Sequence, residues 1–148
     1  MKGMNVGRIV LGGVVAGLVI NAGEFVLNVA VIGNDMNAAV QRLNLPPIGG
    51  SAMAGFTVLG FALGIGLIGL YAGIRPRFGG GPATALVAGG AVYFFAYLYP
   101  TLGLLIMQMF PARLIAIGLS WGLIEVLAAS LAGAYFYQEE EARRAALL

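Results

Sequence analysis

The chain has 148 residues, of which 60% are hydrophobic and 9% are charged, and its formal net charge is +2. Soluble domains carry roughly a quarter charged residues, so this chain lacks the residues for a charged shell. It contains no Cys and no His, which excludes disulfides, thiol nucleophiles, Cys/His zinc sites, iron–sulfur clusters and His-based catalytic triads.

Four long apolar blocks follow one another along the chain. Each exceeds the roughly 20 residues that cross a hydrocarbon core, and we expect transmembrane helices at about residues 9–32, 52–74, 83–110 and 114–137. The first block is too long for the apolar core of a cleaved signal peptide, so we expect it to be retained. The predicted fold is all-α, a single transmembrane domain over residues 1–148 that forms an antiparallel four-helix bundle.

The loop between the first two blocks reads GNDMNAAVQRLNLPPIGG. Its apolar residues recur at i, i+3, i+4 and i+7, which predicts a short amphipathic helix at about residues 35–43. We expect Asn34 or Asp35 to cap it and Pro46-Pro47 to end it. The helix either lies at the membrane interface or folds against the bundle.

Basic residues predict the orientation in the membrane. Six of them fall on one side of the bundle: Lys2, Arg8, Arg75, Arg77, Arg143 and Arg144. Arg42 and Arg113 fall on the other side, so the positive-inside rule places both termini in the cytoplasm. In the tail, Glu139 with Arg143 and Glu140 with Arg144 form i, i+4 pairs, which predicts that the last helix continues into water.

A stripe of small and polar residues runs along the first block. At 100° per residue its members fall within about 80°, and they are Gly13, Gly17, Asn21, Glu24 and Asn28. Gly13 and Gly17 form a small-xxx-small pair that allows close helix packing. We expect the three polar residues to face the same neighbour, because a charged Glu facing lipid costs at least about 2.5 kcal/mol.

The fourth block offers a matching face, with Gly118 and Gly122 as packing residues and Glu125 as its acid. Helix rise puts Glu24 about 12 Å and Glu125 about 16 Å below the outer helix ends, so the two acids are expected at similar depth. Three residues of the other helices lie in the same outer half and complete a candidate intramembrane polar site: Thr57, Tyr97 and Thr101. Pro100 removes the donor for the Ala96 carbonyl, which predicts a kink there.

Three interpretations of the two acids stay open. They are neutral, hydrogen-bonded links between helices, or they bind a cation, carry a proton or contact a bound cofactor, or they face a partner subunit. Substitution of Glu24 and Glu125 by Gln separates a functional role from a structural one.

Three stretches resemble a set of small four-helix bacterial membrane proteins without assigned function: GRIVLGGVVAGLVINAGEFVLN, RPRFGGGP and WGLIEVLAASLAGAY. The resemblance covers most of the chain. It implies four helices and a bacterial cytoplasmic (inner) membrane, and it transfers no catalytic or binding residue.

For the function, the sequence predicts an accessory or structural subunit of a larger membrane complex, or a homo-oligomer. The alternative is a small ion- or proton-coupled transporter or channel that uses Glu24 and Glu125. An intramembrane enzyme ranks last, because its chemistry would depend on two carboxylates and tyrosines. The expected partners are the lipid bilayer and other transmembrane subunits or further copies of the chain. No feature predicts a metal, a cofactor or a nucleic acid.

Overall fold

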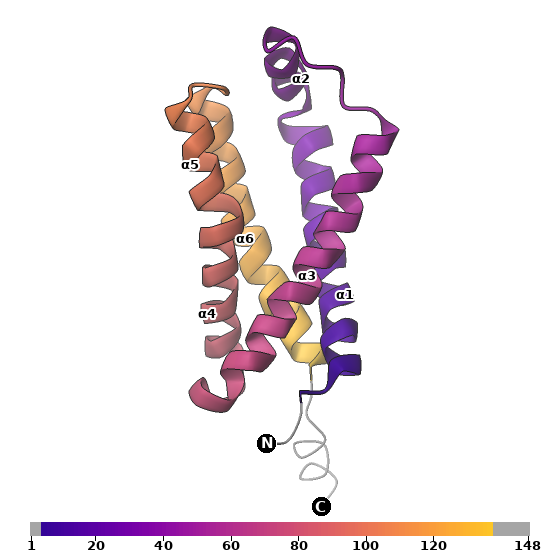
Figure 1. Ribbon diagram of the computed structural model, residues 1–148, viewed down its shortest axis with the longest axis vertical. Coiled ribbons are helices and arrows are strands. Elements are labelled where there is room, and N and C mark those ends of the chain that lie inside the picture. Colours follow the sequence, from indigo (N-terminus) through magenta and orange to yellow (C-terminus); the bar gives the residue numbers. More distant parts are fainter. Residues whose placement is uncertain (1–3, 138–148) are drawn as a thin grey trace, which may run out of the picture.

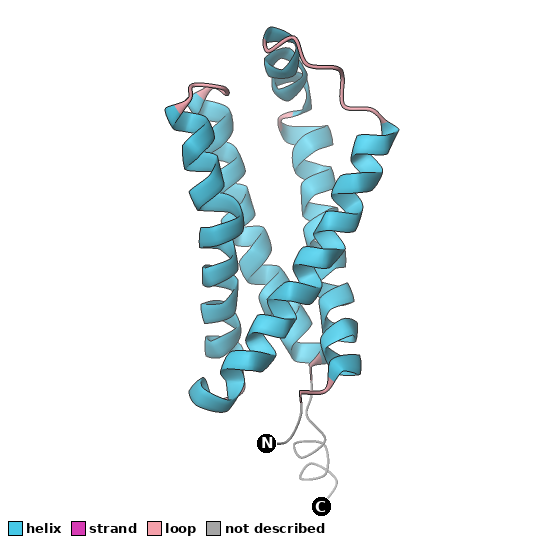
Figure 2. Ribbon diagram, viewed as in Figure 1, coloured by secondary structure: helices cyan, strands magenta, loops and turns pink. Residues whose placement is uncertain are grey.

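Helices make up the structure, a computed structural model that describes residues 4–137 (Figure 1). Four helical stretches are long and apolar enough to cross a membrane, and they are Val6–Val31, Gly50–Phe78, Pro82–Ile106 and Ala112–Phe136. No strand occurs between residues 4 and 137 (Figure 2). The prediction of an all-helical fold is thereby confirmed for residues 4–137, and the four apolar helices are compatible with the predicted multi-pass membrane protein.

Two of the four spans contain a stretch of the wider π-helix. The first span is α1 (Val6–Val26) followed by η1 (Leu27–Val31), and the third is α4 (Pro82–Val92), η2 (Tyr93–Leu98) and α5 (Tyr99–Ile106). The other two are the single helices α3 (Gly50–Phe78) and α6 (Ala112–Phe136), and the short α2 (Gly33–Arg42) follows the first span. Successive spans run in opposite directions (Figure 1). We call the end with the chain termini the inner end and the end with α2 the outer end.

Local caps move several helix limits away from the predicted ones. α1 begins at Val6 rather than residue 9, because the Asn5 side chain accepts the Arg8 N–H at 3.1 Å. α3 runs past residue 74 to Phe78 and ends where Gly79 takes a φ of 83°. The third span ends at Ile106, not at residue 110, because Gln108 is left-handed with a φ of 54°. The Met109 N–H then donates to the Leu104 carbonyl at 3.1 Å, a bond that closes a helix end of the Schellman type.

The predicted loop helix is α2, with corrected ends. Asn34 and Asp35 do not cap it, since both lie in its first turn and the preceding Ile32 gives no side-chain cap. It ends before the two prolines because Asn44 takes a φ of 54°. Ala39 and Val40 are buried on its inward face, so of the two predicted positions α2 takes the one folded against the bundle.

Packing is closest towards the inner end, where the helices converge (Figure 1). Gly12 of α1 and Gly133 of α6 meet there, and a Cβ on Gly133 would lie 2.7 Å from the Gly12 carbonyl oxygen. Small residues at both positions let the two backbones touch. Around this crossing α1, α3, α4 and α6 bury an apolar group that includes Ile20, Leu67, Ile68 and Val126. We call it the inner cluster.

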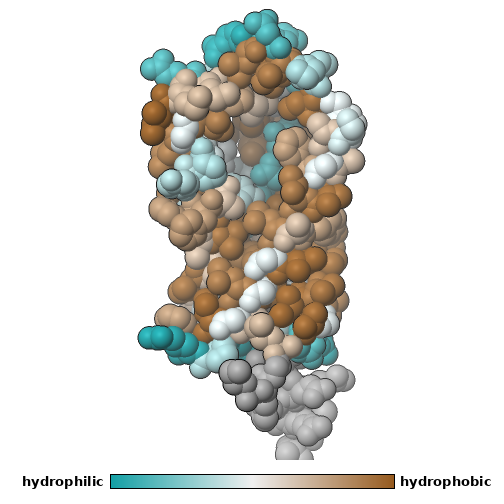
Figure 3. Space-filling model, viewed as in Figure 1, coloured by the Kyte–Doolittle hydropathy of each residue, from teal (hydrophilic) through white to brown (hydrophobic). Residues whose placement is uncertain are grey.

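A second apolar group lies at the outer end and joins η1, α2 and α6. It consists of Leu27, Ile32, Ala39 and Leu114, and we call it the outer cluster. Figure 3 shows hydrophobic surface over most of the molecule's height and hydrophilic residues gathered towards the two ends. The predicted membrane orientation also depends on Lys2 and on the charged tail with Glu139, Glu140, Arg143 and Arg144, which lie outside the described residues.

Candidate functional site

Glu24 and Asn28 form one polar unit at the end of the first span. The Asn28 amide donates to the Glu24 carboxylate at 2.8 Å and to the Glu24 carbonyl at 2.9 Å. A side chain that takes the carbonyl four residues back competes with the helix's own hydrogen bonds. The helix widens at this place into η1, where the Ile32 N–H reaches five residues back to the Leu27 carbonyl. Glu24 is half-buried, whereas Asn28 is exposed.

Glu125 is the second acid, and α6 carries it into the interior with 5% of its surface exposed. The Tyr97 hydroxyl of η2 donates to its Oε1 at 3.2 Å. Its Oε2 is buried without a hydrogen-bond partner and lies against the α-carbon of Gly23. Because Gly23 directly precedes Glu24, the structure places the Glu125 carboxylate beside the turn of α1 that carries the other acid.

Two glycines and the chain's one Trp hold this arrangement in place. A Cβ at Gly122 would lie 2.7 Å from the Tyr97 ring, so Gly122 makes room for the tyrosine, and Gly23 makes room for the Glu125 carboxylate. The Trp121 indole N–H donates to the Gly23 carbonyl at 3.2 Å, which fixes α6 against α1. Tyr97 also stacks on Tyr93, with ring centroids 6.1 Å apart.

A pocket of about 280 Å³ lies next to the acids, towards the outer end. Its polar lining comes from Glu24, Asn28, Tyr97 and Thr101, all of which the sequence predicted as site residues. Gly118 and eight apolar residues of the helices and their connections form the rest: Leu27, Ile32, Met36, Leu104, Phe110, Leu114, Ile115 and Leu119. Figure 3 shows a hollow with hydrophilic surface inside it in the outer part of the hydrophobic belt. Tyr97 lines the pocket and also donates to Glu125, so it lies between the pocket and the second acid.

Asn21 and Thr57, which were predicted to belong to this site, lie apart from the pocket. The Asn21 amide donates to the backbone carbonyl of Thr57 at 3.2 Å and to that of Gly17. The Thr57 hydroxyl donates to the Met53 carbonyl of its own helix. The predicted stripe therefore faces two neighbours, since Asn21 faces α3 while Glu24 and Asn28 face the pocket.

The predicted packing glycines also divide. Gly13 and Gly17 pack against Ile65, Phe61 and Gly64 of α3, so close packing occurs there, although with a different helix from the one that carries Glu125. Gly118 packs against no other part of residues 4–137, because none of their atoms lies within 4 Å of a Cβ built on it. It lines the pocket instead. No sequence pattern indicated the contact of Gly23 with Glu125 or the π-helical η1, whereas Pro100 indicated an irregularity near η2.

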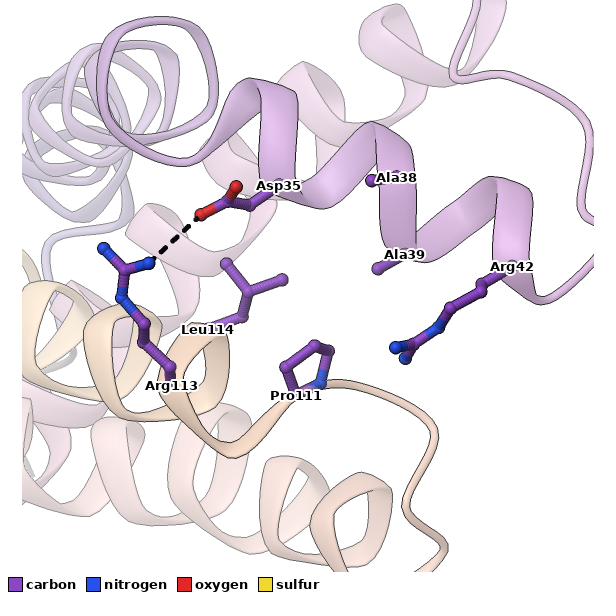
Figure 4. A pocket seen from close by; sticks show the side chains of 7 residues that line it. All are labelled: Asp35, Ala38, Ala39, Arg42, Pro111, Arg113 and Leu114. Carbon is purple, nitrogen blue, oxygen red and sulfur yellow. Dashed lines mark ion pairs between the residues drawn. The ribbon is translucent and has the colours of Figure 1, made fainter.

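A second, outer pocket of about 270 Å³ lies between α2 and the start of α6. Arg113 and Asp35 approach to 3.8 Å at its edge, and Arg42 extends towards the same space from the far end of α2 (Figure 4). The Arg113 and Asp35 side chains are 81% and 55% exposed, and an exposed pair of this kind adds little stability. The burial of Ala39 in the outer cluster, rather than this ion pair, therefore accounts for the position of α2.

The chemistry open to the site follows from its charges. The polar groups that the structure places at the two acids belong to Asn28, Tyr97 and Trp121, and all three are neutral. Two neighbouring carboxyls at membrane depth are stable only with a proton or a cation, because an isolated buried charge is costly. Within residues 4–137 no group of three or more His, Cys, Asp or Glu side chains could hold a metal ion. Comparison with protein-family models, with curated proteins and with solved structures finds no match for this chain.

Proposed function

We propose that the chain is a small proton-coupled cation transporter of a bacterial cytoplasmic membrane, with both termini in the cytoplasm. The orientation is supported by Arg8, Arg75 and Arg77, which all belong to the inner end of the spans. The bacterial membrane is supported by the resemblance to small four-helix bacterial membrane proteins.

The observation that carries the proposal is the acid pair beside a pocket. Acids that only link helices are expected to be fully bonded within a dense interface. Here Glu24 lines a pocket of about 280 Å³ and Glu125 keeps a buried oxygen without a hydrogen-bond partner. A cation that enters the pocket can replace a proton on Glu24, and Tyr97 links this exchange to Glu125.

The position of the pocket on the outer side of the inner cluster fits transport. The inner cluster and the Gly12–Gly133 crossing close the bundle towards the inner end, while the pocket lies towards the outer end. This is the arrangement of a carrier with its site accessible from one side. Transport then requires the helices that diverge at the outer end to approach there and to separate at the inner end.

Flux in liposomes tests the proposal. The full chain is reconstituted with a pH-sensitive dye inside, and gradients of Na⁺, K⁺, tetramethylammonium and benzyltrimethylammonium are imposed in turn. We expect at least one cation to drive proton movement about tenfold faster than in liposomes that contain the Glu24→Gln, Glu125→Gln double variant. Asp35→Asn is the matched control, because Asp35 is an exposed acid outside the pocket. Equal proton movement with the double variant and the unchanged chain would refute the proposal.

A second candidate is the accessory subunit or homo-oligomer, which a stripe on α3 favours. Gly55, Ala62, Gly66 and Gly73 fall within about 40° on that helix, and all four are exposed. No atom lies within 4 Å of a Cβ built on any of the three glycines. Small residues on an open helix face suit another transmembrane helix better than lipid, because they let backbones approach closely.

A further inference from the structure

We propose that the pocket beside Glu24 binds an amphipathic organic cation, a protonated or quaternary amine attached to a small apolar body. This inference deepens the transport proposal, because it names the substrate class of the same site. It requires only that the pocket binds a cation, so binding can be tested separately from transport.

The lining of the pocket has a polar part and apolar walls. Four polar side chains make up the polar part, and eight apolar side chains together with Gly118 make up the walls. An inorganic cation such as Ca²⁺ needs six to eight oxygen ligands, and it would leave the apolar walls without contact. An organic cation uses both parts, since its charge lies at Glu24 and its body packs on residues such as Leu104 and Ile115.

Size and aromatic residues agree with this class. A volume of about 280 Å³ is near the lower end of the range of about 300–1,000 Å³ that small-molecule pockets occupy. Tyr97 and Phe110 both line it, and aromatic rings attract quaternary ammonium groups through cation–π interactions. A single-ring amine is therefore the expected scale of ligand.

Access to the pocket favours an amphipathic ligand. Figure 3 shows the hollow within the hydrophobic belt rather than at a hydrophilic end of the molecule. Ligands that partition into the outer half of the lipid therefore reach the pocket from the side. The amine of phosphatidylethanolamine has the same cationic chemistry, but its phosphate would lie close to two acids and be repelled.

Competition binding on the full-length chain in detergent tests this proposal. The probe is radiolabelled benzyltrimethylammonium. The unlabelled competitors are tetramethylammonium, Na⁺, phosphatidylethanolamine and neopentylbenzene, which is the neutral isostere of the probe. We expect each competitor to bind at least tenfold more weakly than unlabelled benzyltrimethylammonium. Neopentylbenzene that competes as well as the cation would overturn the charge requirement, and equal competition by tetramethylammonium would overturn the apolar one. Strong competition by phosphatidylethanolamine would identify a lipid headgroup as the ligand.

Substitutions in the pocket test whether the ligand binds there. Glu24→Gln removes the charge and is expected to weaken binding at least tenfold, while Asp35→Asn changes it less than twofold. Gly118→Leu keeps both acids and fills the pocket, because nothing lies within 4 Å of a Cβ at Gly118, and it is expected to abolish binding. Gly103→Leu, at an exposed and open position of α5, is its matched control. Unchanged binding in Gly118→Leu would exclude this pocket.

The binding and flux results separate the two proposals. Proton movement driven by Na⁺ or K⁺, without binding of benzyltrimethylammonium, would support the transport proposal and refute the proposal of an organic substrate. The opposite result is binding that Glu24→Gln and Gly118→Leu abolish, with no proton movement in liposomes. It would support the ligand site and refute the transport proposal.

Discussion

Two glycines are as important to the site as its polar residues, because they leave room for the side chains of neighbouring helices. Glu125 fits between α6 and α1 because Gly23 has no Cβ, and Tyr97 reaches Glu125 because Gly122 has none. Polar contacts between membrane helices need such close approach. The two glycines therefore matter for the acid pair although they carry no functional group.

Gly23→Ala tests this dependence. The new Cβ would meet the Glu125 carboxylate, which must turn away and lose the Tyr97 hydroxyl. Overpacking of a close contact costs about 1–3 kcal/mol, so we expect a lower unfolding temperature in detergent and weaker binding of benzyltrimethylammonium. The shorter acid in Gly23→Ala, Glu125→Asp is expected to restore part of both.

The control for this substitution is Gly103→Ala. Gly103 is helical and exposed, with no atom within 4 Å of a built Cβ. Alanine is favoured over glycine within a helix by roughly 0.5–1 kcal/mol, so the unfolding temperature should stay or rise. A Gly23→Ala chain as stable as the Gly103→Ala chain would show that Glu125 is not confined by Gly23.

The sequence predicted part of the site at this scale. Helical periodicity placed Glu24 and Asn28 together and put Glu125 at similar depth, and in the structure Glu125 lies against Gly23, the residue that precedes Glu24. The same periodicity grouped Asn21 with them, whereas in the structure the Asn21 amide donates to the Thr57 carbonyl of α3. A stripe about 80° wide spans the boundary between two neighbours, and which neighbour each residue meets depends on how α1 crosses α3 and α6.

At the scale of elements, the two π-helical segments set the shape of the pocket. η1 contributes Leu27 and Asn28, and η2 contributes Tyr97. Such wider turns are frequent at functional sites because they redirect side chains that a regular helix would point elsewhere. Pro100 gives η2 a cause, since it has no N–H for the Ala96 carbonyl. The Tyr99 N–H donates five residues back to the Phe94 carbonyl.

Pro100→Ala tests this cause. Alanine supplies the missing N–H, so the chain from Tyr93 to Leu98 can return to regular α-helix and α5 rotates relative to α4. Thr101 and Leu104 then leave their places in the pocket lining. We expect an unchanged or higher unfolding temperature together with at least tenfold weaker binding of benzyltrimethylammonium.

Pro82→Ala is the control for that variant, because Pro82 lies in the first turn of α4, where no helical N–H bond is lost. Its binding is expected to match that of the unchanged chain. Unaltered binding in Pro100→Ala would mean that η2 persists for another reason, such as the packing of Tyr97 on Gly122.

At the scale of the whole molecule, hydropathy was enough to predict four membrane-spanning helices but not their contacts. The spans are apolar on nearly every face, because the same residue types face lipid and neighbouring helices. Phe95 is 72% exposed and Ile68 is 0% exposed, yet both are large hydrophobic residues. Hydropathy therefore could not predict that the helices converge at the inner end and diverge at the outer end, nor that a pocket lies between them.

The exposed stripe on α3 is a candidate surface for pairing with a second copy of the chain. Only 6% of the most apolar window of Pro82–Ile106 is buried within the chain, and the α3 stripe is exposed, so the single chain leaves surface for partners.

If copies pair through the stripe, a two-fold axis brings Gly66 near its equivalent. Because the chain has no Cys, Gly66→Cys should give a disulfide-linked dimer when native membranes are oxidised. Ala128→Cys, an exposed small residue at a similar helical depth on α6, should stay monomeric. Equal dimer yields at both positions would indicate random collision, and the absence of dimer at Gly66 would exclude pairing through this face.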